Sequence, residues 1–525
     1  MNNSIKKLTY PIKLLIIIYI VGFSHSTLLP FIMEMTAITL LARYRPHLLI
    51  KSILMIFVVI EGAQLASVFN TGFYIQTLTL TNLSEVNSVG NFVIASTIII
   101  TLFYFTLFLK PSKKPIKGLS LACLLFSLVM SISLFRNTPI YNFSSSIYEA
   151  CNQYIKSLSA KNPANAKHFK RTYISSEKDN LPQSLHSKNY NVIVIFTEGF
   201  SSVVMSNEIT PNFIKLSRQS VNFLNYYNHT AATFRGIRGQ LTSGYQFMGG
   251  FNSENAGVGQ ISVDAVKERF NGKLISIPNI LSTHNYKSYF LASNSKHANL
   301  SQMISTLGFH DVYGREDVNG AIDGELTDKQ SYELLWKKIN EPHDKPFFMG
   351  VYTVGTHLGM DSPDEKFGDG KNEYKNKFYN LDYQFGTFFK KFKNSSISDN
   401  TILIFTADHA AFPAPKFKET FNSKSNEFVD KVPFIVYKKN APAIDFDADG
   451  KNSLDMAPTL LDILEVKNGD NYFLGCSLFD SKCTSSFDNT TAIGDFLINT
   501  QHAKMRAFDN PEIKKKINLF YTISG

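Results

Sequence analysis

Long apolar runs fill the first quarter of this 525-residue chain and stop at about Phe135. Runs of this length predict membrane-spanning helices. The stretch Ile12–Leu41 is too long for one ordinary crossing and is interrupted at Pro30. We interpret it as two short helices, although a single long kinked helix stays open. The five predicted helices cover about 10–27, about 29–43, Leu49–Phe69, Asn91–Leu109 and Leu119–Phe135.

The basic residues around these segments predict their orientation. Lys and Arg precede the first segment, lie between the second and third, and lie between the last two, whereas the loop 70–90 contains neither. Placing every basic cluster in the cytoplasm gives five crossings and exports everything after Phe135. The formal net charge of +10 therefore fits membrane topology better than nucleic-acid binding, because the basic residues are scattered or flank apolar runs. A cleaved signal peptide is not expected, because further spanning segments follow.

The pattern after the membrane part predicts an α/β domain. Residues 1–136 form the predicted transmembrane domain, the polar stretch 137–188 is interpreted as a linker, and 189–525 form the predicted exported domain. Predicted strands are Val192–Phe196, Tyr286–Ala292, Phe347–Val351, Ile402–Phe405 and Pro433–Val436. Predicted helices are Asn212–Ser217, Gly236–Thr242, Asp328–Lys338, Asn376–Lys393 and Ser453–Leu464. Such alternation predicts a mainly parallel sheet covered by helices on both faces.

Metal-type ligands follow two of the predicted strands. Glu198 comes just after the apolar strand Val192–Phe196, and Asp408 and His409 follow Ile402–Phe405. A lone acid at such a place is more often a solvated turn residue. In open α/β sheets, however, ligands gather at the carboxyl ends of the strands. Two buried strands that each end in such residues therefore predict a metal site.

The segment Asn228–Gly244 contains a candidate nucleophile, Thr233. It precedes a Gly- and Arg-containing stretch that can begin a helix, where a hydroxyl meets unpaired backbone N–H groups. That environment suits a nucleophile attacking a phosphorus or sulfur ester, although a helix N-cap is the commoner role. Thr230 is the alternative nucleophile. Arg235 and Arg238 are candidates for binding phosphate oxygens, with surface salt bridges as an equal alternative, and Arg235 is preferred only because it is closer to Thr233.

Two further features stay open at this point. His357 follows another predicted strand, and a structural and a catalytic role are equally expected for it. Cys476 and Cys483 are close enough to close a small loop in an oxidising compartment, and a reduced, buried pair is the alternative.

Five segments, in this order, resemble the sulfatase-like transferases of the alkaline-phosphatase type. The segments are NVIVIFTEGFS, HTAATFRGIRGQLTSG, FTADH, VPFIVY and DMAPTLLDIL. The motif resemblance covers most of 191–478. Within that superfamily, five membrane helices followed by an exported domain resemble the lipoteichoic acid synthases and the phosphoethanolamine and phosphoglycerol transferases.

The resemblance implies roles for particular residues. One divalent metal, Mn²⁺ or Zn²⁺, is expected to bind to Glu198, Thr233, Asp408 and His409. Thr233 is then the nucleophile that becomes a phospho-threonine, and His357 contacts the transferred phosphate or protonates a leaving group. Oxygen and nitrogen ligands without thiolate suit either metal and do not choose between them.

Some residues depart from the pattern of the phosphoethanolamine transferases that modify lipid A. Those enzymes usually carry several disulfides and a Cys-flanked nucleophile, whereas here Phe234 follows Thr233 and no cysteine is near. This favours the phosphoglycerol-transferase side. After the strand in YFLASNSKH, where the family often has a charged or imidazole side chain, this chain offers Ser293, Asn294 and His297. We take Arg235, Asn294 and His297 as the substrate-binding candidates. Ala410, where many relatives have Gly, is a milder departure.

The predicted function is a metal-dependent transferase of the bacterial inner (cytoplasmic) membrane, multi-pass, with its catalytic domain on the periplasmic or extracellular side. It moves phosphoglycerol or phosphoethanolamine from a phospholipid donor, through a phospho-threonine, to a cell-envelope glycan or lipid acceptor such as lipopolysaccharide. The alternative is a membrane-tethered phosphodiesterase or sulfatase. Sulfate chemistry is disfavoured because formylglycine sulfatases need a Cys or Ser at the position of Thr233. A third hypothesis is a non-enzymatic scaffold that binds envelope polymer.

Overall fold

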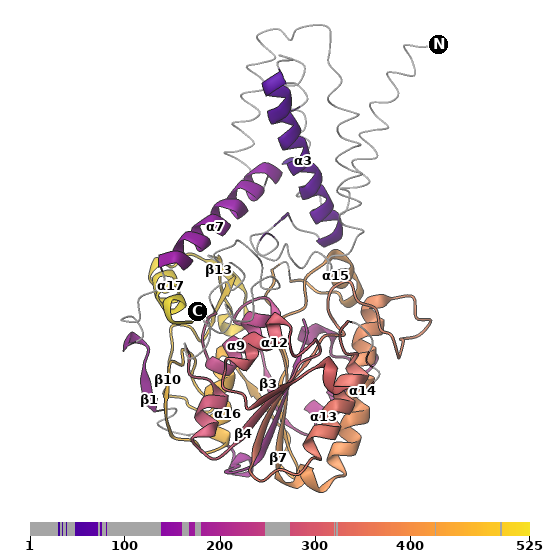
Figure 1. Cartoon of the computed structure of the whole chain (residues 1–525), viewed down its shortest axis with the longest axis vertical. Coiled ribbons are helices and arrows are strands. Elements are labelled where there is room, and N and C mark those ends of the chain that lie inside the picture. The colour runs from indigo at the N-terminus through magenta and orange to yellow at the C-terminus, as the bar shows by residue number, and fades with distance from the viewer. Residues whose placement is uncertain are drawn as a thin grey trace. The chain divides into compact units, whose positions relative to one another are not determined.

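The computed structural model describes residues 48–71, 138–159, 167–173, 180–246 and 274–524, apart from 320, 322, 323, 426, 494 and 495, together with a few isolated positions before residue 81. The chain forms two compact units (Figure 1). The first contains residues 1–154 and 413–416, and the second contains 155–412 and 417–525. The boundaries of the predicted domains stay predictions.

The described part of the first unit is helical. Helix α3 (Leu48–Thr71) coincides with the predicted apolar segment Leu49–Phe69, and the first turns of α7 (Pro139–Ser159) follow. Gln64 joins the two helices, since its Nε2 donates to the Pro139 carbonyl at 2.8 Å. Among the helices in the described ranges, none combines the length and apolar character needed to cross a membrane. Apart from isolated positions, the other four predicted spans lie outside the described residues.

An eight-stranded sheet forms the centre of the second unit, in the order β5-β4-β6-β2-β7-β8-β3-β9 (Figure 1). The strands are β2 (Asn191–Thr197), β3 (Val221–Leu224), β4 (Lys287–Leu291), β5 (Asp311–Tyr313), β6 (Phe347–Thr353), β7 (Thr401–Ala407), β8 (Phe434–Lys438) and β9 (Ile444–Asp447). Strand β2 lies parallel to β6 on one side and to β7 on the other. Strand β8 runs antiparallel to both of its neighbours. The predicted α/β domain is confirmed, and its sheet is mixed.

Helices cover both sides of this sheet, with α13 and α14 on one side and α9 and α16 on the other (Figure 1). Among the described residues, the helices lying wholly in the second unit are α8 (Pro211–Ser217), α9 (Thr233–Thr242), α11 (Ile277–Ser282), α12 (Asn299–Ser305), α13 (Asp328–Ile339), α14 (Glu373–Lys393), α16 (Met456–Ile463) and α17 (Pro511–Ser524). Helix α15 (Pro415–Phe421) follows β7 in the chain. Aromatic side chains fill the space between α8, α14 and the sheet, where Phe213 stacks on Phe405 at 4.1 Å and contacts Phe385 at 4.8 Å.

The predicted helices are present, with shifted ends. The helix expected over Gly236–Thr242 already begins at Thr233, and the one expected from Asn376 begins at Glu373. The stretch Ser453–Leu464 opens with a 3₁₀ turn before α16 begins at Met456.

Smaller elements complete the second unit. Strands β11 (Thr490–Ile493), β12 (Phe496–Asn499) and β13 (Arg506–Phe508) form an antiparallel sheet. Within the stretch interpreted as a linker, β1 (Arg171–Tyr173) pairs with β10 (Asn468–Asn471). Cys476 and Cys483 are joined by a disulfide, which resolves the alternative left open by the sequence.

Candidate metal centre

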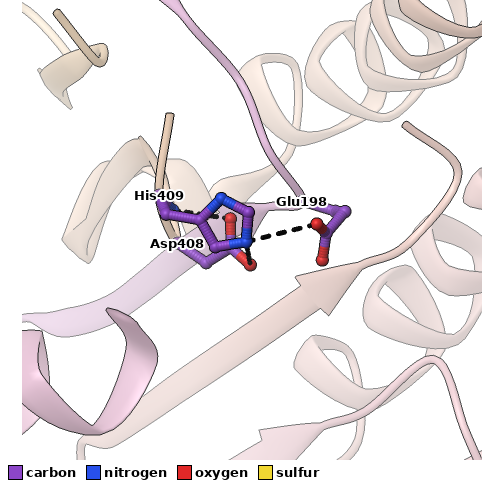
Figure 2. A group of neighbouring side chains, drawn as sticks. All are labelled: Glu198, Asp408 and His409. Carbon is purple, nitrogen blue, oxygen red and sulfur yellow. Dashed lines mark hydrogen bonds and ion pairs between the residues drawn. The ribbon is translucent and has the colours of Figure 1, made fainter. Parts of the chain in front are cut away.

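Glu198, Asp408 and His409 meet beyond the carboxyl ends of two adjacent strands (Figure 2). Strands β2 and β7 are parallel and pair in register as far as Thr197 and Ala407, so the residues that follow them emerge side by side. His409 Nε2 lies 3.3 Å from Glu198 Oε1 and 3.4 Å from Asp408 Oδ2. All three side chains are buried, and their ligand atoms all lie within 4.8 Å of one another.

The hydrogen bonds around these side chains fit a divalent metal ion. Asp408 Oδ1 accepts from the backbone N–H of Gly199 at 2.8 Å and of His409 at 2.7 Å, whereas its Oδ2 is buried and accepts no hydrogen bond from the described residues. His409 Nδ1 lies 2.8 Å from the Ala410 carbonyl. A proton on Nδ1 leaves the Nε2 lone pair to face the two carboxylates, which is the orientation that metal-binding histidines adopt. The buried acceptor atoms therefore form a ready ligand set.

The pKa shifts of the three groups show which charges a bound metal ion would balance. Burial raises the pKa of the Asp408 carboxyl well above its ordinary value, and the nearby charge of Glu198 adds to this effect. Burial also opposes the ionisation of Glu198, but the charge of His409 and its hydrogen bond lower the Glu198 pKa below its ordinary value. Burial disfavours the imidazolium of His409, yet the charges of Asp408 and Glu198 raise its pKa to about 9. Without a metal, the group thus keeps positive charge on the imidazole; a bound dication would take over that role.

Thr233 lies beside this group, as the sequence predicts. It is the first residue of α9, and its Oγ1 donates to Glu198 Oε2 at 2.8 Å. The Tyr352 hydroxyl donates to the same oxygen at 2.5 Å. Ala232, just before Thr233, has φ +74°, a backbone conformation that costs free energy in a non-glycine residue. The chain thus holds the hydroxyl at a helix N-terminus, next to a carboxylate and facing the ligand set.

Helix α9 is seated directly on the segment that carries Asp408. A Cβ atom added at Gly236 would lie 2.0 Å from the Asp408 carbonyl oxygen, so only glycine permits this approach. Gln240, one turn further on, donates from Nε2 to the Ala407 carbonyl at 2.9 Å. These contacts fix the distance between Thr233 and the end of β7.

The loop after β6 brings His357 to the same side of the sheet. The N–H of Glu198 donates to the Thr353 carbonyl at 3.0 Å, and the Thr356 hydroxyl donates to the Glu198 carbonyl. His357 is half-buried, its Nδ1 lies 2.9 Å from the Leu358 carbonyl, and its charge contributes to the lowered pKa of Glu198. The structure thus places His357 near the ligand set without a direct bond to it among the described residues.

Sequence reasoning missed Tyr352 and Thr356. Tyr352 lies opposite Phe196 in the β2–β6 register, and Phe196 is two positions before Glu198. The signal was therefore a tyrosine near the end of a neighbouring strand. It becomes informative only once β2 and β6 are known to be adjacent.

The alternative nucleophile and the second arginine have other partners. Thr230 Oγ1 donates to the Ala492 carbonyl at 3.0 Å. The guanidinium of Arg238 donates to the Met303 carbonyl at 2.5 Å and to Thr306 Oγ1 at 2.7 Å, which joins α9 to α12. Both contacts are structural, and they leave Thr233 as the hydroxyl at the ligand set.

The three predicted substrate-binding residues are not brought to the ligand set by any hydrogen bond or ion pair within the described ranges. Arg235 is buried in the first turn of α9. Asn294 Oδ1 accepts from Ser301 Oγ at 2.7 Å. The side chain of His297 is exposed, and its backbone N–H donates to Ser295 Oγ. Their assignment as substrate ligands stays a prediction.

Comparisons with known proteins agree with this fold and site. The Sulfatase family model matches residues 158–466. Among curated proteins, the chain is 23% identical to phosphoglycerol transferase I of Escherichia fergusonii, over 56% of this chain and 39% of that protein. It is 24% identical to lipoteichoic acid synthase 2 of Bacillus subtilis, over 65% of this chain and 55% of that protein. The chain thus spans about 39–55% of the length of these relatives.

Solved structures show the same architecture. The lipoteichoic acid synthase LtaP from Listeria monocytogenes superposes with a TM-score of 0.52 at 16% identity, covering 69% of this chain and 96% of that one. A protein in the alkaline phosphatase superfamily from Vibrio parahaemolyticus gives a TM-score of 0.51 at 20% identity, covering 71% of this chain and 94% of that one. At these identities the likeness establishes the fold.

Proposed function

Because this chain belongs to the Sulfatase family, we propose that it is a metal-dependent phosphotransferase with Thr233 as its nucleophile. The observation that carries the proposal is the hydrogen bond of 2.8 Å from Thr233 Oγ1 to Glu198 Oε2, made beside a buried ligand set with an unused Asp408 oxygen. A hydroxyl in a purely structural role would not need two carboxylates and an imidazole around it.

Each residue of the site has its own role in the proposed reaction. Glu198, Asp408, His409 and Thr233 would hold one divalent ion, Mn²⁺ or Zn²⁺, which lowers the pKa of a bound hydroxyl and neutralises charge on phosphoryl oxygens. Glu198 Oε2 orients the Thr233 hydroxyl and receives its proton. The Thr233 oxygen then forms a bond to the phosphorus of the donor phosphodiester.

The leaving group and the acceptor complete the reaction. As the Thr233 oxygen attacks, the bond from phosphorus to the donor's leaving oxygen breaks, and that oxygen takes the electron pair and a proton, for which His357 is the nearest candidate acid on the loop after β6. An acceptor hydroxyl attacks the resulting phospho-threonine in the second step and restores the Thr233 hydroxyl. The N-terminus of α9, where Thr233 lies, favours an anionic phosphoryl group.

The relatives' names and the sequence support a class of donor and a class of acceptor. We propose a phospholipid donor, whose phosphoglycerol or phosphoethanolamine headgroup is transferred to a cell-envelope glycan or lipid. The names phosphoglycerol transferase and lipoteichoic acid synthase support a phosphoglycerol donor. Export of the second unit from a bacterial cytoplasmic membrane is supported by the distribution of basic residues around the apolar segments and by the Cys476–Cys483 disulfide, since disulfides persist in oxidising compartments.

Labelling of Thr233 tests the proposal. The full-length protein in detergent, loaded with Mn²⁺, is incubated in parallel with phosphatidylglycerol and phosphatidylethanolamine that carry a radiolabelled headgroup, and the label is mapped to a peptide. We expect label on Thr233 from one donor, none in Thr233→Ala, and unchanged labelling in the control Thr230→Ala, whose hydroxyl bonds the Ala492 carbonyl. Labelling that persists in Thr233→Ala contradicts the proposal. Release of all label to water with acceptor present would instead identify a phosphodiesterase.

A further inference from the structure

Lys377 is a buried cation on α14. Its side chain is 3% exposed, its Nζ donates to the His357 carbonyl at 3.1 Å, and the ammonium lies 4.5 Å from the centre of the Tyr374 ring. In the part of the chain that the structure describes, no carboxylate comes within 4.0 Å of this ammonium. Buried charges are normally paired, because leaving an ion without a counter-ion in a dry interior is costly. Glu373, Glu198 and Asp361 act on this ammonium only from beyond that distance, so the described residues give Lys377 no direct ion pair.

Its position connects Lys377 to the ligand set. Two consecutive loop residues make the connection: Thr356 donates its hydroxyl to the Glu198 carbonyl, and His357 accepts from Lys377. Burial lowers the pKa of the Lys377 ammonium to about 8, and Glu198 is among the carboxylates whose charge opposes that effect. A lysine has three N–H donors, and the His357 carbonyl uses one. The other two donors have no hydrogen-bond partner among the described residues.

We propose that Lys377 binds a non-bridging oxygen of the substrate's phosphoester anion, while its bond to the His357 carbonyl keeps the loop after β6 in place. The proposal rests on the proposed function, since the anion is that of the same reaction. An anionic phosphoester supplies the missing counter-charge, and hydrogen bonds between two charged groups are the strong ones. Arg235, to which the sequence assigned this role, makes no bond to the ligand set among the described residues.

Anion binding by matched lysine variants tests the proposal. The probes are inorganic phosphate and dihexanoyl-phosphatidylglycerol, titrated calorimetrically into the Mn²⁺-loaded full-length protein in the Thr233→Ala background, where no turnover follows. We expect Lys377→Met to weaken the binding of both probes about 10–100-fold, the loss expected for a hydrogen bond between charged groups. The control is Lys375→Met, two residues away on α14, whose ammonium lies 3.7 Å from Glu208 and 4.9 Å from the Phe367 ring. It should change neither affinity.

Two further variants separate charge from loop positioning and serve if Lys377→Met does not fold. Lys377→Arg keeps the charge and should retain most of the affinity, whereas Lys377→Gln keeps a donor for the His357 carbonyl without charge and should bind as weakly as Lys377→Met. Wild-type affinity in Lys377→Gln overturns the proposal, because the lysine then acts only through the loop. A loss confined to inorganic phosphate overturns the assignment to the donor and identifies a free-phosphate site. Since binding needs no phospho-threonine, these results are independent of whether Thr233 becomes labelled.

Discussion

Asp328, at the start of α13, holds the loop that carries His357. Its Oδ1 accepts from the Gly355 N–H at 3.2 Å, and its Oδ2 accepts from Asn380 at 3.1 Å. The side chain is 1% exposed, and burial raises its pKa from 3.8 to about 7 against the effect of these two hydrogen bonds. Asp328 is therefore still partly protonated near pH 7, and its contribution to the stability of the folded protein decreases as pH rises.

Asp328→Asn should remove that dependence. Between pH 4 and pH 7 the folded protein retains a proton on Asp328 that the unfolded chain has lost, so this residue's contribution to the free energy of unfolding falls as pH rises through that window, by up to about 4 kcal/mol. The asparagine carbonyl can still accept from Gly355, and no proton is exchanged. We expect the stability of the variant to increase relative to that of the wild type as pH rises from 5 to 8. Thermal unfolding followed by Trp336, the single tryptophan, measures this, and parallel profiles contradict it.

At the scale of elements, the placement of α9 depends on Gly236. Gly236→Ala puts a methyl group against the Asp408 carbonyl, so α9 must move away from the end of β7 and carry Thr233 with it. We expect a loss of about 1–3 kcal/mol of stability, typical of overpacking, together with at least a tenfold weaker binding of Mn²⁺. The control is Gly239→Ala in the same helix, where the added Cβ meets the His229 ring at 2.1 Å. It should lose stability and keep most of its metal affinity. Equal losses of metal affinity in the two variants would show that the Asp408 contact has no special role.

The elements also show what the sequence can predict. Strands β2, β6 and β7 are buried along nearly their whole length, so their sequences are continuous apolar runs that are recognisable on their own. Strands β3, β5 and β9 escaped prediction because they are only three or four residues long and are partly exposed. Their strand conformation is stabilised by pairing with β8, β4 and β3, which a local pattern does not contain.

The same limit applies to the site. Glu198, Asp408 and His409 were predictable because the carboxyl ends of parallel strands are where ligands gather. Tyr352 bonds Glu198 across 154 positions of the chain, and Lys377 approaches the site through the backbone of His357. Neither contact can be predicted from the residues that are adjacent to it in the sequence. Contacts of this kind require the strand order and the packing of α14, which only the structure provides.

At the scale of the whole molecule, the ligand set joins segments that are far apart in the chain. Glu198 lies 35 positions before Thr233, and 209 positions separate Gly199 from its bonding partner Asp408. A ligand that binds only the folded state stabilises it by mass action, by about 2.7 kcal/mol at a hundred times its dissociation constant. A metal held by these residues would therefore act on the stability of the second unit as a whole.

Metal removal should lower the unfolding temperature of the full-length protein, and Mn²⁺ should restore it. The physical reason is that burial and the nearby charge of Glu198 disfavour the ionised carboxylate of Asp408 until a dication balances them. Scanning calorimetry after treatment with a chelator, with and without added Mn²⁺ or Zn²⁺, measures the shift. Asp408→Asn removes one charge of the ligand set and should abolish the shift in unfolding temperature. Asp328→Asn, on α13, should keep that shift. A shift of the same size in Asp408→Asn would mean that the metal stabilises the protein elsewhere. The metal that raises the unfolding temperature more would be the ion that this ligand set prefers.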